Sequence, residues 1–292
     1  MPKHAYLILA HNEFDLLKRL MEALDYEEND IYIHVDKKAV GFYKEELIQN
    51  IRKSSVHFVK RNKIQWGGYS IVNAELELLE AAEKKGYSYY HLLSGADYPL
   101  VSQRKIHEFF DMNHGKEFVI MKEYTDNPEI FHYRIKCYHF FQEKLGRGND
   151  KSVYHFLNKV SLKIQCILNV DRRKKQNWVY KKGSQWFSIT DDFAKYLLKN
   201  KKIIKKQFRY TSCPDEIVLQ TILWNSEFKN RMADTVIRYE VWKKWASGPS
   251  VLEKEDYGRL KESNSLFARK FSFSNNKSKE LLEDISDDIK QE

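Results

Sequence analysis

The chain has 292 residues, of which 42% are hydrophobic, so it can bury a substantial core in one large domain or two smaller ones. No apolar run approaches the roughly 20 residues that span a bilayer, and the N-terminal apolar stretch is too short for a secretory signal, which predicts a cytoplasmic protein. The net charge of +9 at pH 7 predicts an attraction to an anionic partner, such as nucleic acid, an acidic membrane surface or a phosphorylated substrate. Three cysteines lack the spacing of metal ligands or of a disulfide framework and are expected to be reduced thiols: Cys137, Cys166 and Cys213.

The first half of the chain alternates short apolar runs with stretches of helical spacing. The first apolar run is followed by a helical stripe of leucine and methionine over residues 16–24, and a second helical stripe covers residues 71–82. Four strands are predicted in this half, at 5–10, 31–36, 56–59 and 87–94. Strands that alternate with helices in this way favour an α/β fold with a mainly parallel, Rossmann-like sheet flanked by helices.

Ligands of a parallel sheet bind at the carboxyl ends of its strands. The polar and small residues that directly follow the predicted strands are therefore candidate ligand contacts: His11, Asn12, Asp36, Ser94, Gly95 and Asp97. The sequence contains no G-x-G-x-x-G after the first strand and no G-x-x-x-x-G-K-[ST] anywhere. A dinucleotide dehydrogenase and a P-loop enzyme are therefore disfavoured.

The second half of the chain is less regular. A strand is predicted at 184–190, a helix at 191–199, and a further helix that opens at Pro214. The last twenty residues, 273–292, are polar and contain few side chains suited to a core. They are predicted to form a loosely attached tail or one marginal helix.

Eight sequence blocks occur in a fixed order: AYLILAHNEFDLLKRLMEAL, IYIHVDKK, IQWGGYSIVNAELELLEAA, HLLSGADYPL, KGSQWFSIT, CPDEIVLQTIL, IRYEVW and LFARKF. With these blocks the chain resembles the core-2/I-branching β-1,6-N-acetylglucosaminyltransferases and the related peptide O-xylosyltransferases, over residues 5–271. The resemblance implies a GT-A type glycosyltransferase that inverts the anomeric centre and uses a UDP-sugar donor. It also implies that the enzyme needs neither a metal ion nor another cofactor.

The same resemblance implies one GT-A domain over residues 1–272, followed by the polar tail. Residues 1–122 would form mainly the half that binds the nucleotide-sugar, with the uridine near His11 and Asn12. Residues 123–272 would form the half that binds the acceptor and the diphosphate.

Departure of a nucleoside diphosphate requires positive charge at its phosphates. Many GT-A enzymes supply this charge with a metal ion held by an Asp-x-Asp motif, whereas here the second predicted strand ends with Asp36 followed by two lysines. Arginine and lysine can take the place of the metal, since a guanidinium matches phosphate oxygens. The resemblance assigns this role to Arg269 and Lys270, which are expected to be exposed in the empty enzyme. Arg238 is expected either to face the diphosphate or to cap a strand.

Inverting transfer also requires a carboxylate that takes the proton of the acceptor hydroxyl. Asp215 and Glu216 follow Pro214 at a predicted helix start, where one carboxylate is enough to complement the helix dipole. The resemblance to the branching enzymes assigns the base to Glu216, which we rank first. The block around Asp97 is closer to the xylosyltransferase form, in which that aspartate is the rival base, and both carboxylates are expected to line one acceptor pocket.

The remaining candidates concern substrate binding. Asp36 is expected either to contact the donor or to cap the next turn, whereas His34, inside a strand, is expected to be a hydrogen-bonded core histidine. Trp66 offers either a stacking surface or a core side chain, and Gly67 beside it lets the backbone approach a ligand. Trp186 resembles an aromatic residue near the sugar or the acceptor.

The leading functional prediction is transfer of N-acetylglucosamine from its UDP-sugar to a glycan or lipid-linked glycan acceptor, in bacterial capsule or exopolysaccharide synthesis. Transfer of xylose or another sugar is the alternative. A more distant alternative is a non-catalytic module that binds nucleic acid or an anionic glycan, which the ordered acidic blocks disfavour. The expected location is cytoplasmic, with peripheral association at the inner face of the membrane as a further option, and no oligomeric state is predicted.

Overall fold

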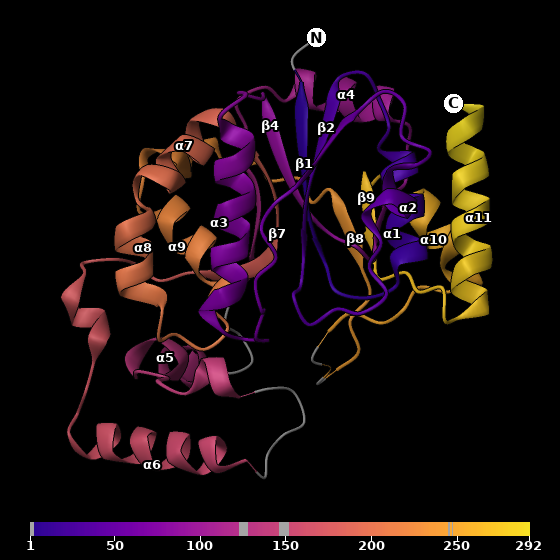
Figure 1. Cartoon of the computed structure of the whole chain (residues 1–292). Coiled ribbons are helices and arrows are strands. Elements are labelled where there is room, and N and C mark those ends of the chain that lie inside the picture. Colours follow the sequence, from indigo (N-terminus) through magenta and orange to yellow (C-terminus); the bar gives the residue numbers. More distant parts are fainter. Residues whose placement is uncertain (1–2, 123–127, 146–151, 245, 247) are drawn as a thin grey trace.

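The computed structural model describes residues 3–122, 128–145, 152–244, 246 and 248–292. Its centre is a six-stranded sheet flanked by helices, with a small three-stranded sheet beside it (Figure 1). The large sheet contains β1 (His4–Ala10), β2 (Asn29–Val35), β3 (Ser55–Phe58), β4 (Tyr89–Ser94), β6 (Phe118–Lys122) and β7 (Lys182–Thr190). The small sheet contains β5 (Asp97–Pro99), β8 (Arg238–Glu240) and β9 (Phe267–Arg269).

The large sheet has the strand order β3-β2-β1-β4-β7-β6. Its first four strands are parallel, whereas β7 pairs antiparallel with both β4 and β6. The predicted α/β class and the mainly parallel sheet are therefore confirmed, and β7 makes the sheet a mixed one. Each of the five predicted strands overlaps an observed strand. Strand β6 and the small sheet were not predicted.

Eleven α-helices are assigned within the described residues, and they surround the sheets (Figure 1). They are α1 (Phe14–Ala23), α2 (Lys44–Ile48), α3 (Tyr69–Glu83), α4 (Gln103–Met112), α5 (Pro128–Lys136), α6 (Val153–Ile167), α7 (Asp191–Lys199), α8 (Lys201–Phe208), α9 (Val218–Trp224), α10 (Tyr257–Glu262) and α11 (Asn276–Gln291). In the described part of the chain, no helix is both long enough and apolar enough to cross a membrane.

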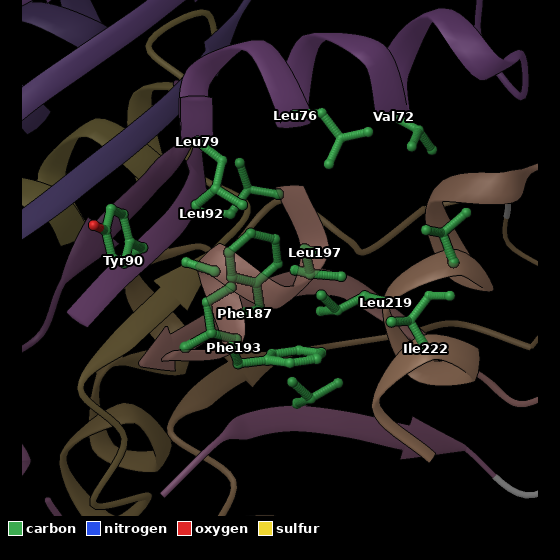
Figure 2. Packing of buried hydrophobic residues seen from close by; sticks show 14 of the residues in the cluster. Val72, Leu76, Leu79, Tyr90, Leu92, Phe187, Phe193, Leu197, Leu219 and Ile222 are labelled. Atoms are coloured by element: carbon green, nitrogen blue, oxygen red, sulfur yellow. The ribbon is translucent and has the colours of Figure 1, made fainter. Parts of the chain in front are cut away.

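One hydrophobic cluster joins α3, α7 and α9 to the sheet (Figure 2). Helix α3 turns Val72, Leu76 and Leu79 to one side, because a spacing of four and then three residues follows the helical repeat. These side chains meet Leu197 of α7 and Leu219 of α9 within the same cluster. Each buried apolar side chain of this size contributes about 1.5–3 kcal/mol relative to full exposure.

The polar segment at the C-terminal end is packed, not loose. Helix α11 buries Leu281, Leu282 and Ile285 in a second hydrophobic cluster, which also includes residues of α1, α4 and the small sheet. The side chain of Asn275 accepts a hydrogen bond from the Ser278 backbone N–H and so caps the first turn. Of the two predicted alternatives, a helix forms and the loose attachment is wrong, because the few apolar residues of this segment lie on one helix face.

The Pro-Asp-Glu block does not open an α-helix directly. Residues Pro214–Glu216 form a single 3₁₀ turn, and α9 begins only at Val218. Cys213, just before the turn, has a left-handed backbone with φ of 49°. The two carboxylates therefore lie in a tight turn that connects α8 to α9 and contacts β7.

Candidate active site

The carboxyl ends of β1, β2 and β4 lie together at one edge of the large sheet. The Asp36 backbone N–H donates to the Ala10 carbonyl at 2.9 Å, and the Gly95 N–H donates to the Leu9 carbonyl at 2.9 Å. A Cβ atom on Gly95 would lie 3.3 Å from the Cβ of Ala10, so the chain after β4 runs tightly against the end of β1. The residues after β1, β2 and β4 are thus brought together at one edge.

At this edge, His11 and Asn12 are exposed, while Asp36 is mostly buried. The Asp36 carboxylate accepts hydrogen bonds from the backbone N–H groups of Lys38, at 2.9 Å, and Ile64, at 3.3 Å. It therefore caps the turn after β2, which was one of the two roles predicted for it. His34 accepts a hydrogen bond from the Asn62 N–H, and burial lowers the pKa of its imidazole, so the prediction of a core histidine is confirmed.

The small sheet lines up charged residues across its three strands. Asp97 on β5 lies directly opposite Arg269 on β9, which in turn lies opposite Glu240 on β8. The Arg269 Nε is 3.2 Å from the Asp97 Oδ1, and its Nη1 is 3.9 Å from the Glu240 Oε1. We call these three residues and Arg238 the small-sheet cluster.

Arg238 is the most deeply placed cation of the small-sheet cluster. Its Nη2 donates to the Phe187 carbonyl at 2.7 Å and lies 3.2 Å from the Ser188 hydroxyl, whereas its Nη1 finds no hydrogen-bond acceptor within the described residues. Burial lowers the pKa of Arg238 to about 10. Burial also raises the pKa of Asp97, an effect that Arg269 and Arg238 oppose.

Trp186 on β7 completes the surroundings of Arg269. The guanidinium carbon of Arg269 lies 4.2 Å from the centre of the Trp186 ring. The Arg269 side chain is only 13% exposed, so the expectation that it is exposed in the empty enzyme is wrong. Lys270 is half-buried, and its carbonyl accepts a hydrogen bond from the Leu252 N–H. Stacking on the ring and pairing with two carboxylates account for the burial of Arg269.

A second charged group, which we call the Glu216 cluster, lies beside the start of β7. The Oε2 of Glu216 accepts a hydrogen bond from Arg134 on α5 at 2.9 Å and lies 3.3 Å from the Nζ of Lys182 on β7. The Glu216 side chain is 33% exposed. It is therefore held by two cations and is still open to solvent.

Two partly buried carboxyl groups, those of Asp215 and Glu75, complete the Glu216 cluster. Burial, together with the neighbouring charge of Glu216, raises the pKa of Asp215 to about 7. Burial and the charge of Asp215 raise the pKa of Glu75 on α3 well above its usual range. Gln185 of β7 donates to the Glu75 carboxyl at 2.6 Å. In both groups the protonated form is therefore stabilised relative to that of an exposed carboxyl group.

The Trp66-Gly67 segment packs against the turn that carries Glu216. The Cys213 N–H donates to the Gly67 carbonyl at 2.8 Å, and a Cβ on Gly67 would lie 3.2 Å from the Cys213 sulfur. Trp66 is 45% exposed, so it presents a ring surface beside this turn and is not a core side chain. Cys213, like Cys137 and Cys166, is a free thiol, as predicted.

The structure separates the two candidate bases. Asp97 is 1% exposed within the small-sheet cluster, whereas Glu216 belongs to the neighbouring cluster and is accessible. Strand β7 contacts the surroundings of both, through Lys182 and Trp186, and the acceptor pocket that they were expected to share stays a prediction. In the described part of the chain, no three His, Cys, Asp or Glu side chains are placed to hold a metal ion, and the predicted metal independence stays a prediction.

Sequence reasoning missed four members of these clusters: Glu75, Arg134, Lys182 and Glu240. Glu75 carried a signal, because it falls three residues after Val72 and four before Leu79, on the apolar face of a predicted helix. An acidic residue at such a position is costly to bury without a purpose. No sequence pattern of this kind marks Arg134, Lys182 or Glu240.

The matching family model covers most of these elements. The model described as "Branch: Core-2/I-Branching enzyme" matches residues 4–261, well over half of the chain. The chain belongs to this family. The resemblance carried by the ordered sequence blocks is thereby confirmed. The match ends before β9, so Arg269 and Lys270 of this Core-2/I-Branching enzyme lie outside it.

Among curated proteins, this family member is similar to xylosyltransferases. It is 27% identical to Xylosyltransferase 2 of Rattus norvegicus over 308 aligned residues, covering 96% of this chain and 33% of the rat protein. It is 24% identical to Xylosyltransferase oxt of Drosophila melanogaster, covering 87% of this chain and 30% of the fly protein. The chain therefore spans about a third of the length of the curated relatives it matches.

Two solved structures align with the chain at TM-scores below 0.5. Mouse xyloside xylosyltransferase 1 aligns with a TM-score of 0.40 and 9% identity, over 92% of this chain and 97% of the mouse chain. GlyE of Streptococcus pneumoniae aligns with a TM-score of 0.46 and 10% identity, over 98% of this chain and 60% of GlyE. Neither similarity defines the site of this enzyme.

Proposed function

We propose that this Core-2/I-Branching enzyme is an inverting, metal-independent glycosyltransferase of the GT-A type that moves a sugar from a UDP-sugar to a hydroxyl of a glycan. One observation supports this most directly: β7 contacts both an accessible carboxylate, through Lys182 and Glu216, and a buried arginine, through Trp186 and Arg269. Transfer needs a carboxylate at the acceptor and positive charge at the leaving group. The same strand holds groups of both kinds.

Glu216 is the proposed general base. A base must come within about 2.6–3.2 Å of the proton's oxygen, and of the two candidates only the side chain of Glu216 has substantial solvent access. As the acceptor oxygen attacks the anomeric carbon, its proton passes to the Glu216 carboxylate. The bond from the anomeric carbon to the diphosphate oxygen breaks, and UDP leaves with the electron pair. Arg134 and Lys182 hold the carboxylate in place.

Arg269, Lys270 and Arg238 are the proposed partners of the diphosphate. The Nη1 group of Arg238 is a buried donor that lacks an acceptor among the described residues, which suits an anionic oxygen. The small-sheet cluster has no net charge, because its two arginines are matched by two carboxylates. The positive charge of Lys270 is therefore needed to attract the negatively charged diphosphate. His11, Asn12 and the edge beside Asp36 are the proposed contacts of the uridine end.

Trp186 and Trp66 are the proposed sugar contacts. Trp66 exposes its ring beside the Glu216 turn, and Trp186 stacks on Arg269 between the two clusters. Flat aromatic surfaces suit the apolar faces of sugar rings, because they bury carbon-bound hydrogens without demanding a hydrogen bond. Gly67, Ser94 and Gly95 complete the proposed substrate-binding set, as backbone positions of close approach.

The identity of the donor sugar is the next part of the proposal. N-acetylglucosamine was the first prediction and xylose the alternative, and the relatives named above are xylosyltransferases. We therefore propose UDP-xylose and UDP-N-acetylglucosamine as the two donors to compare first. A glycan or lipid-linked glycan of a bacterial capsule or exopolysaccharide is the proposed acceptor.

Isothermal titration with a panel of UDP-sugars, followed by slow hydrolysis assays, tests this function. We expect one UDP-sugar to bind with micromolar affinity and to be hydrolysed slowly in the absence of an acceptor. A matched panel of GDP- and CMP-sugars should not bind. Tight binding of RNA or of an anionic glycan, without binding of any nucleotide-sugar, would instead support a non-catalytic module and overturn the proposal.

A further inference from the structure

Helix α6 presents an apolar face to solvent. Seven of its large apolar side chains are exposed, among them Phe156 at 65% and Ile167 at 74%, and so is Leu168 directly after the helix. We call six of these exposed side chains the α6 stripe: Phe156, Leu157, Val160, Ile164, Ile167 and Leu168. Their spacing of three and four residues places them on one side of the helix. In Figure 1, α6 lies at the edge of the molecule, beyond α5 and away from the large sheet.

The opposite side of α6 faces the protein and is largely polar. Asn158, Leu162 and Gln165 are its buried residues. Gln165 accepts a hydrogen bond from the Tyr138 N–H at 2.7 Å and donates to the Tyr138 carbonyl at 2.9 Å, which fixes the orientation of the helix. A surface helix usually turns its apolar side inward, so α6 is inverted. An apolar surface held outward in this way marks an interaction site.

Charge indicates what covers the stripe. Residues 152–170 contain no aspartate or glutamate, while Lys159 and Lys163 are exposed on α6. Both lysines follow Phe156 at helical spacings, three and seven residues later, and so border one edge of the α6 stripe. A second copy of the chain, packed stripe to stripe, would bring further lysines close and no carboxylate from α6 to pair with them. An anionic surface satisfies both the lysines and the stripe.

The width of the α6 stripe also favours an anionic surface over a second helix as its partner. A helix pair needs only a narrow seam, whereas the exposed apolar side chains of α6 cover about a third of the helix circumference at 100° per residue. Helices that lie in a membrane interface carry a broad apolar face bordered by lysine or arginine. We propose that α6 is an interfacial helix that docks this enzyme on an anionic lipid surface. Its stripe enters the boundary of the acyl chains, and Lys159 and Lys163 contact headgroup phosphates.

Vesicle flotation of the full chain tests this proposal. We expect the protein to float with vesicles that contain phosphatidylglycerol, and to remain unbound with pure phosphatidylcholine. Phe156→Ser combined with Ile164→Ser should abolish flotation. The matched control is Val40→Ser combined with Met112→Ser, which removes two exposed apolar side chains from other surfaces and should float normally. Lys159→Gln and Lys163→Gln should each weaken binding about fivefold, a loss that salt should mimic.

Circular dichroism and UDP titration of the Phe156→Ser, Ile164→Ser variant show whether it remains folded. Because Phe156 and Ile164 point to solvent from the outer side of α6, donor binding should be unchanged, and the outcome is independent of the proposed catalysis. Equal flotation with both vesicle types, or with neither, would overturn the proposal. It is likewise overturned if sedimentation velocity shows a dimer that this variant converts to a monomer.

Discussion

The small-sheet cluster and the Glu216 cluster both pair carboxylates with cations, yet they differ in access to solvent. Asp97 is 1% exposed and lies between two arginines, whereas Glu216 is 33% exposed and lies between Arg134 and Lys182. A buried carboxylate that is paired with an arginine organises its neighbours, while an open one can exchange a partner for a substrate hydroxyl. Under the proposed function, the buried small-sheet cluster would serve the leaving group and the accessible Glu216 cluster would serve the acceptor.

The sharpest test of this comparison is Glu216→Gln. The amide keeps the shape of the side chain but removes the basic oxygen, so we expect kcat to fall by roughly 10²- to 10⁴-fold while the Kd for UDP barely changes. Steady-state kinetics and calorimetric titration measure the two quantities. If the rate of transfer survives within tenfold, Glu216 is not the base.

Asp97→Asn should act on stability more than on the chemical step. It removes one charge from a buried ion cluster and leaves Arg269 and Arg238 with one carboxylate in place of two, which costs about 3–5 kcal/mol of unfolding free energy. Urea denaturation measures this loss. A variant that stays as stable as the wild type but loses kcat as strongly as expected for Glu216→Gln would reverse the two roles.

Arg269→Ala and Lys270→Ala should weaken UDP binding. A charge-assisted contact to phosphate is worth about 1.5–3 kcal/mol, so each change should raise the Kd for UDP by roughly 10- to 100-fold. Because Arg269 is paired with Asp97 and Glu240, its removal should also lower stability, whereas Lys270→Ala should not. Lys202→Ala, on the exposed face of α8, is the matched control. Unchanged UDP affinity in both variants would remove these residues from the donor site.

The raised pKa of Asp215 predicts that the stability of the protein depends on pH. The pKa of Asp215 is raised from 3.8 to about 7 in the folded state, so the folded state binds the proton more tightly than the unfolded state. Its contribution to the free energy of unfolding is therefore complete below pH 3.8 and is lost as the pH rises towards 7, at no more than about 1.4 kcal/mol per pH unit. Asp215→Asn should flatten this slope, as measured by denaturation at pH 5 and pH 7. An identical slope in the variant would contradict the assignment.

The smallest expected effect concerns metal ions. If Arg269, Lys270 and Arg238 neutralise the diphosphate, excess EDTA should leave both UDP binding and transfer unchanged. Loss of activity in EDTA, with recovery on addition of Mn²⁺, would show that these side chains do not act alone.

The strands and main helices of the first half could be predicted from the sequence, because the apolar spacing of each segment matches the side that it buries in the core. The runs at 5–10 and 31–36 became β1 and β2 with small shifts at their ends. By contrast, the small sheet consists of three-residue strands, and Asp97, Glu240 and Arg269 meet only through long-range pairing. No local pattern encodes such pairing.

The state of each site residue was harder to predict than its position. The resemblance placed Arg269 and Glu216 in the site, but not the burial of the first or the partners of the second. Burial of Arg269 depends on Trp186, which lies more than eighty residues earlier in the chain. The core contacts of α11 were missed for a related reason, since its composition is polar and only its spacing places Leu281, Leu282 and Ile285 on one face.

Strand β9 occupies the middle of the small sheet, between β5 and β8. Neither outer strand pairs with the other, so the cluster that contains Asp97 and Arg238 has no scaffold until residues 267–269 are in place. During translation these residues leave the ribosome long after the large sheet has emerged, and domains begin to fold from the N-terminal side. Under the proposed function, a nascent chain that lacks residues 267–269 should therefore have a nearly complete α/β core and yet be unable to retain a nucleotide-sugar.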